Sequence, residues 1–162
     1  MSDATVTGLK ELQAFLDQLP AKMEANIMRA AMRQGANVVL EEAKRNVPVK
    51  SELLRNGLKV STGLRRGIVT AKVKAKGKHG PLAHLVEYGT AAHFIKPKKA
   101  KSLFFAGLMR DGVDHPGAKP KPFMRPALDS QSQAALLAVG EAIKKRLTKQ
   151  GLDASGVDLE AQ

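Results

Sequence analysis

The sequence has no cysteine and no tryptophan, and only one tyrosine and five phenylalanines among its 162 residues. Without cysteine, neither a disulfide framework nor a thiolate-ligated zinc site can form. The few aromatic residues do not cluster as they do in sheets that stack on RNA bases. No segment approaches the ~18 consecutive apolar residues of a membrane span, and the first ten residues do not resemble a secretion signal. We therefore expect a soluble protein that is made in the cytoplasm and has no membrane contact.

Short motifs of common enzyme and cofactor sites are missing as well. The sequence contains no G-x-S-x-G, no G-x-G-x-x-G and no G-x-x-x-x-G-K-[ST]. His84 and Glu87 are the remote catalytic alternative, and they are also the first pair to test as metal ligands. Because we expect them on a strand, where residues three apart point to opposite faces, they should not converge on one ion. We predict that the chain is not an enzyme and binds no metal or cofactor.

Positive charge is concentrated in the middle of the chain. The whole sequence carries 27 Lys or Arg against 15 Asp or Glu, a net charge of +12. From Lys44 to Arg125 there are 19 basic and four acidic residues, a net charge of +15, so the rest of the chain carries −3. Such a field suits a polyanion, either a nucleic acid or an acidic protein surface. A solvated basic face that serves solubility explains the charge alone equally well.

Apolar residues recur at helical spacing before and after this basic region. The pattern predicts three helices, at about Leu9 to Leu19, Ala21 to Asn46 and Pro126 to Gly151. Pro20 and Pro126 suit first helical turns, where the missing N–H has no partner to lose. Pro48 ends the long helix, because the residue before a proline is pushed out of the α region.

Between the helices the pattern changes to alternation with period two. In Val69 to Lys76 small apolar residues alternate with polar ones, mostly lysines, which predicts a half-buried strand with a lysine face. Gly57 to Thr62 and Leu82 to Tyr88 are its expected neighbours, and Ser102 to Ala106 is either a short, buried fourth strand or a helical turn. We therefore predict an α+β fold. Its small antiparallel sheet of three to four strands would pack against the long N-terminal helix and the C-terminal helix.

The organisation of the chain is expected to be simple. Residues 1–150 are predicted to form a single α+β domain. Within it, Gly89 to Lys101 and Gly107 to Pro122 are rich in Gly, Pro and Lys, which predicts two long loops. Residues 151–162 are small, acidic and without periodicity, so we expect a disordered tail.

Two groups of lysines are candidates for facing DNA or a protein partner. Alternate residues of the predicted strand would form a row with a spacing of about 7 Å, which can follow a phosphate backbone. Lysines on such a strand also prevent open-ended pairing of a sheet edge, and both interpretations stay open. The strand group is Lys72, Lys74, Lys76 and Lys78, and the loop group is Lys96, Lys98, Lys99 and Lys101.

Two motifs go beyond generic patterns. The first runs from Leu82 to Thr90 and contains H-x-V-E-Y-G-T; the second is P-F-M-R-P-A-L, from Pro122 to Leu128, preceded by His115-Pro116-Gly117. In this order and helix-strand-helix frame, they resemble the tail-completion, or head-tail joining, family of long-tailed bacteriophages, also called virion morphogenesis proteins. The resemblance covers about Val6 to Thr148.

The resemblance implies a structural protein that forms a ring at the head-tail junction. Such a protein completes the tail or connector, contacts tail-tube and head-side proteins, and surrounds the DNA channel. It would belong to the virion, in the tail or neck, and to the host cytoplasm before assembly. The lysine-rich loop Lys96 to Lys101 departs from the commoner pattern. A monomeric basic nucleic-acid-binding module is the alternative that the charge alone supports.

Physical roles for the motif residues also follow from their chemistry. Gly89 would allow a sharp turn after a strand, and the Glu87 carboxylate would pair with Arg125. Phe123, between two prolines, would anchor the last helix. We therefore expect a structural motif that fixes the sheet against this helix. Its residues are His84, Glu87, Tyr88, Gly89, Thr90, Pro122, Phe123, Arg125 and Pro126.

Overall fold

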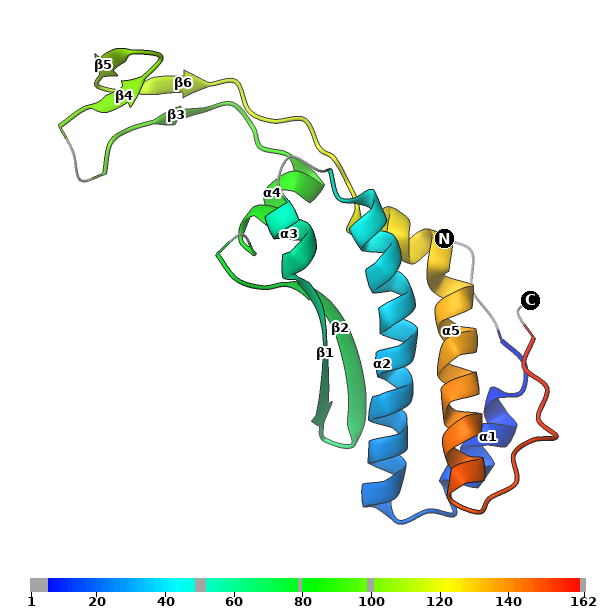
Figure 1. The fold of residues 1–162 in the computed structure, drawn as a ribbon. Coiled ribbons are helices and arrows are strands. Elements are labelled where there is room, and N and C mark those ends of the chain that lie inside the picture. Colours follow the sequence, from blue (N-terminus) through cyan, green and yellow to red (C-terminus); the bar gives the residue numbers. More distant parts are fainter. Residues whose placement is uncertain (1–5, 49–51, 79, 99–100, 161–162) are drawn as a thin grey trace.

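Two long helices form the body of the protein. The computed structural model describes residues 6–48, 52–78, 80–98 and 101–160. Helices α2 (Ala21–Asn46) and α5 (Met124–Lys149) lie side by side and run in opposite directions (Figure 1). They pack tightly at Gly35, where an added Cβ would lie 2.7 Å from the carbonyl oxygen of Ala135. The absence of a side chain at Gly35 therefore lets the two helices pack together.

A hairpin of two strands covers another side of α2. Strands β1 (Leu58–Arg65) and β2 (Ile68–Ala75) pair antiparallel, and Arg66 and Gly67 make the turn with positive φ. Alternate residues of β2 are half-buried and exposed, because one face of the ribbon packs towards the helices. The predicted strand pair and its lysine face are confirmed.

The segment predicted to be the third strand is a helix. Helix α4 (Leu82–Tyr88) turns Ala83, Val86 and Glu87 towards the body, which is helical spacing. Apolar and polar residues do not alternate strictly in this segment, so a strand would have left half of its apolar side chains on the wrong face. The α+β class is confirmed, but the sheet of three to four strands is not. The described part of the chain contains three separate two-stranded sheets instead.

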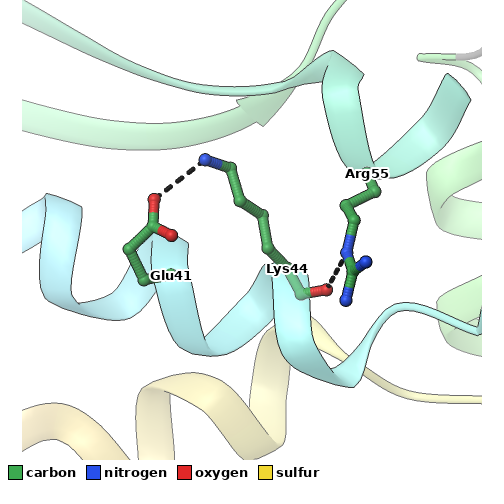
Figure 2. Close-up of polar contacts among 3 residues, drawn as sticks. All are labelled: Glu41, Lys44 and Arg55. Carbon is green, nitrogen blue, oxygen red and sulfur yellow. Dashed lines mark hydrogen bonds and ion pairs between the residues drawn. The ribbon is translucent and has the colours of Figure 1, made fainter. Parts of the chain in front are cut away.

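A short helix joins α2 to the hairpin. Helix α3 (Glu52–Gly57) places the Arg55 side chain against the end of α2, where Nε donates a hydrogen bond of 2.8 Å to the carbonyl oxygen of Lys44. The Lys44 ammonium pairs with Glu41 at 2.8 Å on the same side (Figure 2). The last carbonyls of a helix have no partner within it and carry partial negative charge, so the Arg55 guanidinium stabilises this end of α2.

The first helix and the C-terminal segment form a lobe on α5. Helix α1 (Leu9–Leu16) is buried on one face, and the N–H of Thr7 donates to the carbonyl oxygen of Glu160 at 3.0 Å. Ala154 is fully buried, and Leu159 lies against Gly140. The described residues 151–160, where a disordered tail was expected, follow the body, and Ala154, Leu152 and Leu159 belong to the apolar cluster that also includes side chains of α1 and α5. We call α1 together with residues 151–160 the terminal lobe.

Residues 89–98 and 101–121 form an arm that extends away from the body (Figure 1). Strand β3 (His93–Ile95) pairs with β6 (Val113–His115), and β4 (Leu103–Phe105) pairs with β5 (Leu108–Arg110). The two predicted loops are therefore the two sides of this arm and carry short strands. Residues 102–106 do contain a strand, but Phe104 is 75% exposed and not buried as expected, since β4 is far from the core.

Two apolar clusters hold the body together. The one near α4 includes Val39, Leu58 and Phe123, and the one near the terminal lobe includes Leu12, Ile27 and Leu147. Both clusters contain side chains of α2 and of α5, so the two long helices contribute to the whole core. None of the helices in the described ranges is long and apolar enough to cross a membrane.

Candidate functional site

The two sequence motifs meet where α4 faces the start of α5. The Glu87 carboxylate accepts backbone N–H groups from Phe123 at 2.8 Å, Met124 at 2.9 Å and Arg125 at 3.1 Å. The first N–H groups of an α-helix have no partner within the helix and carry partial positive charge. Glu87 is therefore the N-terminal cap of α5, although it comes from a different helix.

The remaining residues of the second motif complete this cap. Pro126 follows the three donors in the first turn, and as a proline it has no N–H that would need a partner. The Phe123 side chain is fully buried in the cluster between α2, α3 and α5. In the P-F-M-R-P segment, the Phe123 side chain anchors the helix in the core, and the N–H groups of Phe123, Met124 and Arg125 donate to Glu87. Pro126 has no N–H group that would need an acceptor.

Burial and hydrogen bonding act on Glu87 in opposite directions. Burial in the protein raises the pKa of its carboxyl group, because the charged form loses water. The N–H groups of Met124, Phe123 and Arg125, and the nearby Arg125 charge, outweigh this effect, and the pKa ends below its ordinary value. The carboxylate is thus held in its ionised, hydrogen-bond-accepting form.

The predicted contact between Glu87 and Arg125 exists, but not as a side-chain ion pair. Arg125 contacts the carboxylate through its backbone N–H, and its guanidinium lies over the Tyr88 ring, 5.9 Å from the centroid. Among the described residues, ion pairs occur only within α2. The sequence could not distinguish these arrangements, because both bring Arg125 to the end of α4.

The same junction fixes the root of the arm. Gly89 ends α4 with φ of 72°, and a Cβ there would strike the backbone of Ala118 and Pro120. Thr90 and Ala118 exchange backbone hydrogen bonds of 2.9 and 3.0 Å, so the two sides of the arm are paired where they leave the body. The expected sharp turn at Gly89 is confirmed, but it follows a helix and not a strand. Pro122, exposed, leads from the arm to the cap.

A groove with a volume of about 570 Å³ opens beside this junction. His84 and Glu87 both line it, and since they lie on a helix, three residues apart, they are neighbours. The strand-based reason for separating them was therefore wrong. Both Glu87 oxygens already accept N–H groups, however, and no three His, Asp or Glu side chains of the described ranges are grouped as a metal site requires. Most of the groove wall is apolar, with contributions from Val39, Val73 and Leu128.

The lysine face of the hairpin is exposed as predicted. Lys72 and Lys74 lie on β2, Lys76 and Lys78 follow its end, and all four are exposed. The pairing register adds Lys59 opposite Lys74, and cross-strand partners share a face. Sequence reasoning missed Lys59, because its strand has no strict alternation. In the arm, Lys96, Lys98 and Lys101 are exposed, and Lys99 lies outside the described residues. The two lysine groups are thus on different parts of the molecule.

Comparison with known proteins gives one family. Residues 10–89 match the family described as "Bacteriophage HK97-gp10, putative tail-component". The matched segment runs from α1 through α4, including Glu87 and Gly89, and ends where the arm begins. No curated protein and no solved structure matches the chain.

Proposed function

Because residues 10–89 match the HK97-gp10-like family of bacteriophage tail components, we propose that this chain assembles into a ring at the junction between phage head and tail. A structural role in the tail follows from the family. The ring and its location are our proposal. In it, the subunit completes the tail or the connector, touches tail-tube and head-side proteins, and surrounds the DNA channel. Assembly would take place in the host cytoplasm.

The arm is the observation that carries this proposal. Its strands pair with one another and extend from the body, and large apolar side chains along it stay exposed. Contiguous exposed apolar surface is unusual on a monomer and typical of an interaction site. A subunit with such an extension is suited to contact several neighbours at once, as a ring component must.

We also propose that the chain is not an enzyme. The groove brings together His84 and Glu87, the pair that the sequence offered as the catalytic alternative. A general acid or base works best with a pKa near the working pH. The pKa of Glu87 is instead lowered, and its oxygens are occupied by the α5 cap. These contacts support a structural role for the carboxylate.

The exposed lysine face favours a second candidate, a monomeric basic module that binds nucleic acid without sequence preference. Lys59, Lys72 and Lys74 share one face of the hairpin, and no acidic residue lies in β1 or β2. Such a face follows phosphates but cannot identify bases. This candidate explains the charge but not the arm.

Light scattering and electron microscopy separate the two candidates. We expect the purified chain, alone or mixed with its neighbouring tail protein, to give a mass that is a multiple of the subunit mass and ring-shaped particles in micrographs. A mass of one subunit under both conditions, together with tight DNA binding, would reject the ring and favour the monomeric module.

A further inference from the structure

The arm exposes several large apolar side chains. Five of its large side chains are at least 37% exposed: Phe94, Ile95, Phe104, Leu108 and Met109. Taking about 200 Å² for a fully exposed large side chain, they offer roughly 500–600 Å² in total. A specific interface buries about 800 Å² on each partner. The arm alone thus supplies most of the area that one side of such an interface needs.

The tip of the arm has a defined apolar face. Phe104 and Met109 are paired across β4 and β5, and are 75% and 67% exposed. Directly paired residues point to the same side of a two-stranded ribbon, so the two side chains form one projection. A rigid aromatic residue beside a flexible thioether is a combination that fits an apolar pocket well.

The groove at the root of the arm is the matching concave surface. Its volume of about 570 Å³ lies within the ~300–1,000 Å³ typical of pockets that enclose a ligand. Apolar side chains from three elements form much of its wall, namely Val39 of α2, Val73 of β2 and Leu128 of α5. Leu128 is 55% exposed and Tyr88 is 65% exposed at this site, so part of the wall is uncovered.

We propose that the arm tip of one subunit occupies the groove of a neighbouring copy of the same chain. The arm tip and the groove are different patches at opposite ends of the arm. Each copy can therefore insert its own tip into one neighbour and receive the tip of another neighbour in its groove. An interface between two different patches is heterologous, and repeating it closes into a ring when the rotation allows. The inference rests on the proposed ring and specifies the contact that closes it.

The terminal lobe is the competing acceptor. The arm carries seven Lys or Arg against two Asp, a net charge of +5 over residues 89–121. The terminal lobe, α1 with residues 151–160, carries one Lys against four acids, a net charge of −3. Leu12 and Leu16 of the lobe are nevertheless almost fully buried, so that lobe offers charge but little apolar surface to Phe104. The exposed side chains of the tip therefore favour the groove.

Disulfide trapping tests this contact directly, because the chain contains no cysteine of its own. The test variant is the double substitution Phe104→Cys and Leu128→Cys, oxidised mildly and run on a non-reducing gel. We expect a ladder of dimers and higher species that collapses on reduction. The matched control combines Phe104→Cys with Gln18→Cys beside α1, and each single-cysteine variant is run in parallel.

Each outcome decides between acceptors. A ladder confined to the groove pair supports the proposal. A ladder in the control pair means that the lobe is the acceptor, dimers from Phe104→Cys alone mean that two tips meet, and an intramolecular bond means that the arm folds onto its own groove. Any of these three, or no disulfide at all, overturns the proposal.

A second pair of variants separates this inference from the ring itself. Met109→Asp places a charge on the arm tip, and Ile68→Asp places one at an equally exposed site, each 67% exposed in the parent. We expect Met109→Asp to lower the oligomer mass measured by light scattering and Ile68→Asp to leave it unchanged. If the parent is an oligomer and Met109→Asp keeps its mass, the docking fails while the ring survives. If the parent itself is monomeric, the proposed function fails as well.

Discussion

The Glu87 carboxylate accepts the backbone N–H of Phe123 at 2.8 Å across a sequence separation of 36 residues. Glu87 lies just before the arm and Phe123 just after it, so this bond joins the two ends of the arm to each other and to α5. Because the cap also engages Met124 and Arg125, any movement of the arm root would disturb the first turn of α5. The motif residues therefore fix the direction in which the arm leaves the body.

Glu87→Gln should destabilise the protein. The amide retains one acceptor oxygen but turns an NH₂ group towards backbone donors, and the negative charge at the positive end of α5 is lost. We expect the free energy of unfolding to fall by about 1–3 kcal/mol. Urea unfolding measures it, with Glu141→Gln on the exposed middle of α5 as the control, which should change it by less than about 0.5 kcal/mol.

Acid should remove the contribution of Glu87. Its folded pKa is lowered from an ordinary value of 4.5, so the unfolded chain binds more protons between the two values. The stabilisation is therefore complete above the unfolded pKa and disappears as the pH falls through the folded pKa. Urea unfolding at about pH 7 and about pH 4 should show the difference between parent and Glu87→Gln shrinking at the lower pH. A difference that stays constant would show that the charge of Glu87 contributes nothing to the cap.

A double-mutant cycle distinguishes a backbone contact from a side-chain ion pair. Arg125→Gln keeps the backbone N–H that binds Glu87 and removes only the guanidinium over Tyr88. We expect Arg125→Gln to cost less than Glu87→Gln, with a coupling energy below about 0.5 kcal/mol. A coupling of several times this size in thermal or urea unfolding would mean that the two side chains form an ion pair in solution. Unchanged stability of both single variants with failed assembly would instead identify an interface contact.

Two phenylalanines provide a matched comparison of core and arm. Phe123 is fully buried beside the α5 cap, whereas Phe104 is 75% exposed at the arm tip. Phe123→Ala should lower the free energy of unfolding by about 3–5 kcal/mol, because it leaves a cavity in the cluster near α4. Phe104→Ala should change it by less than about 0.5 kcal/mol. If both variants unfold like the parent, the burial of Phe123 is not what anchors α5.

The long helices α2 and α5 were predictable because their ends are marked by local chemistry. Pro20, Pro48 and Pro126 fix the limits of α2 and the first turn of α5, and apolar spacing defines their faces. The β1–β2 hairpin followed from strict alternation in β2. In each case the signal lies within a few residues of the element, so a single sequence contains it.

The remaining elements depend on contacts that no local pattern contains. Helix α4 has only seven residues, too few for apolar spacing to separate a helix from a strand. Its buried Glu87 does not fit an apolar face, and only the N-terminus of α5, which is distant in the sequence, explains why this carboxylate points inwards. The arm exposes Phe104 and Met109, and patterning assigns such residues to a core. The packing of residues 151–160 depends on apolar side chains of α1 and α5 that are distant in the sequence.

The lysine face leads to the last prediction, which distinguishes DNA contact from protection of a sheet edge. In the triple variant with Lys72, Lys74 and Lys76 changed to Gln, three exposed cations are removed from one hairpin face. If this face follows phosphates, duplex affinity at low salt should fall, and the slope of log K against log salt should decrease by up to about 3. Fluorescence anisotropy with a labelled duplex measures both quantities.

The matched control changes the exposed Lys10, Lys22 and Lys149 to Gln, which lowers the net charge equally while leaving the hairpin intact. Equal loss in both triples would mean that only total charge matters. Unchanged DNA binding of the hairpin triple, together with increased aggregation, would show instead that these lysines keep the hairpin from pairing with other chains.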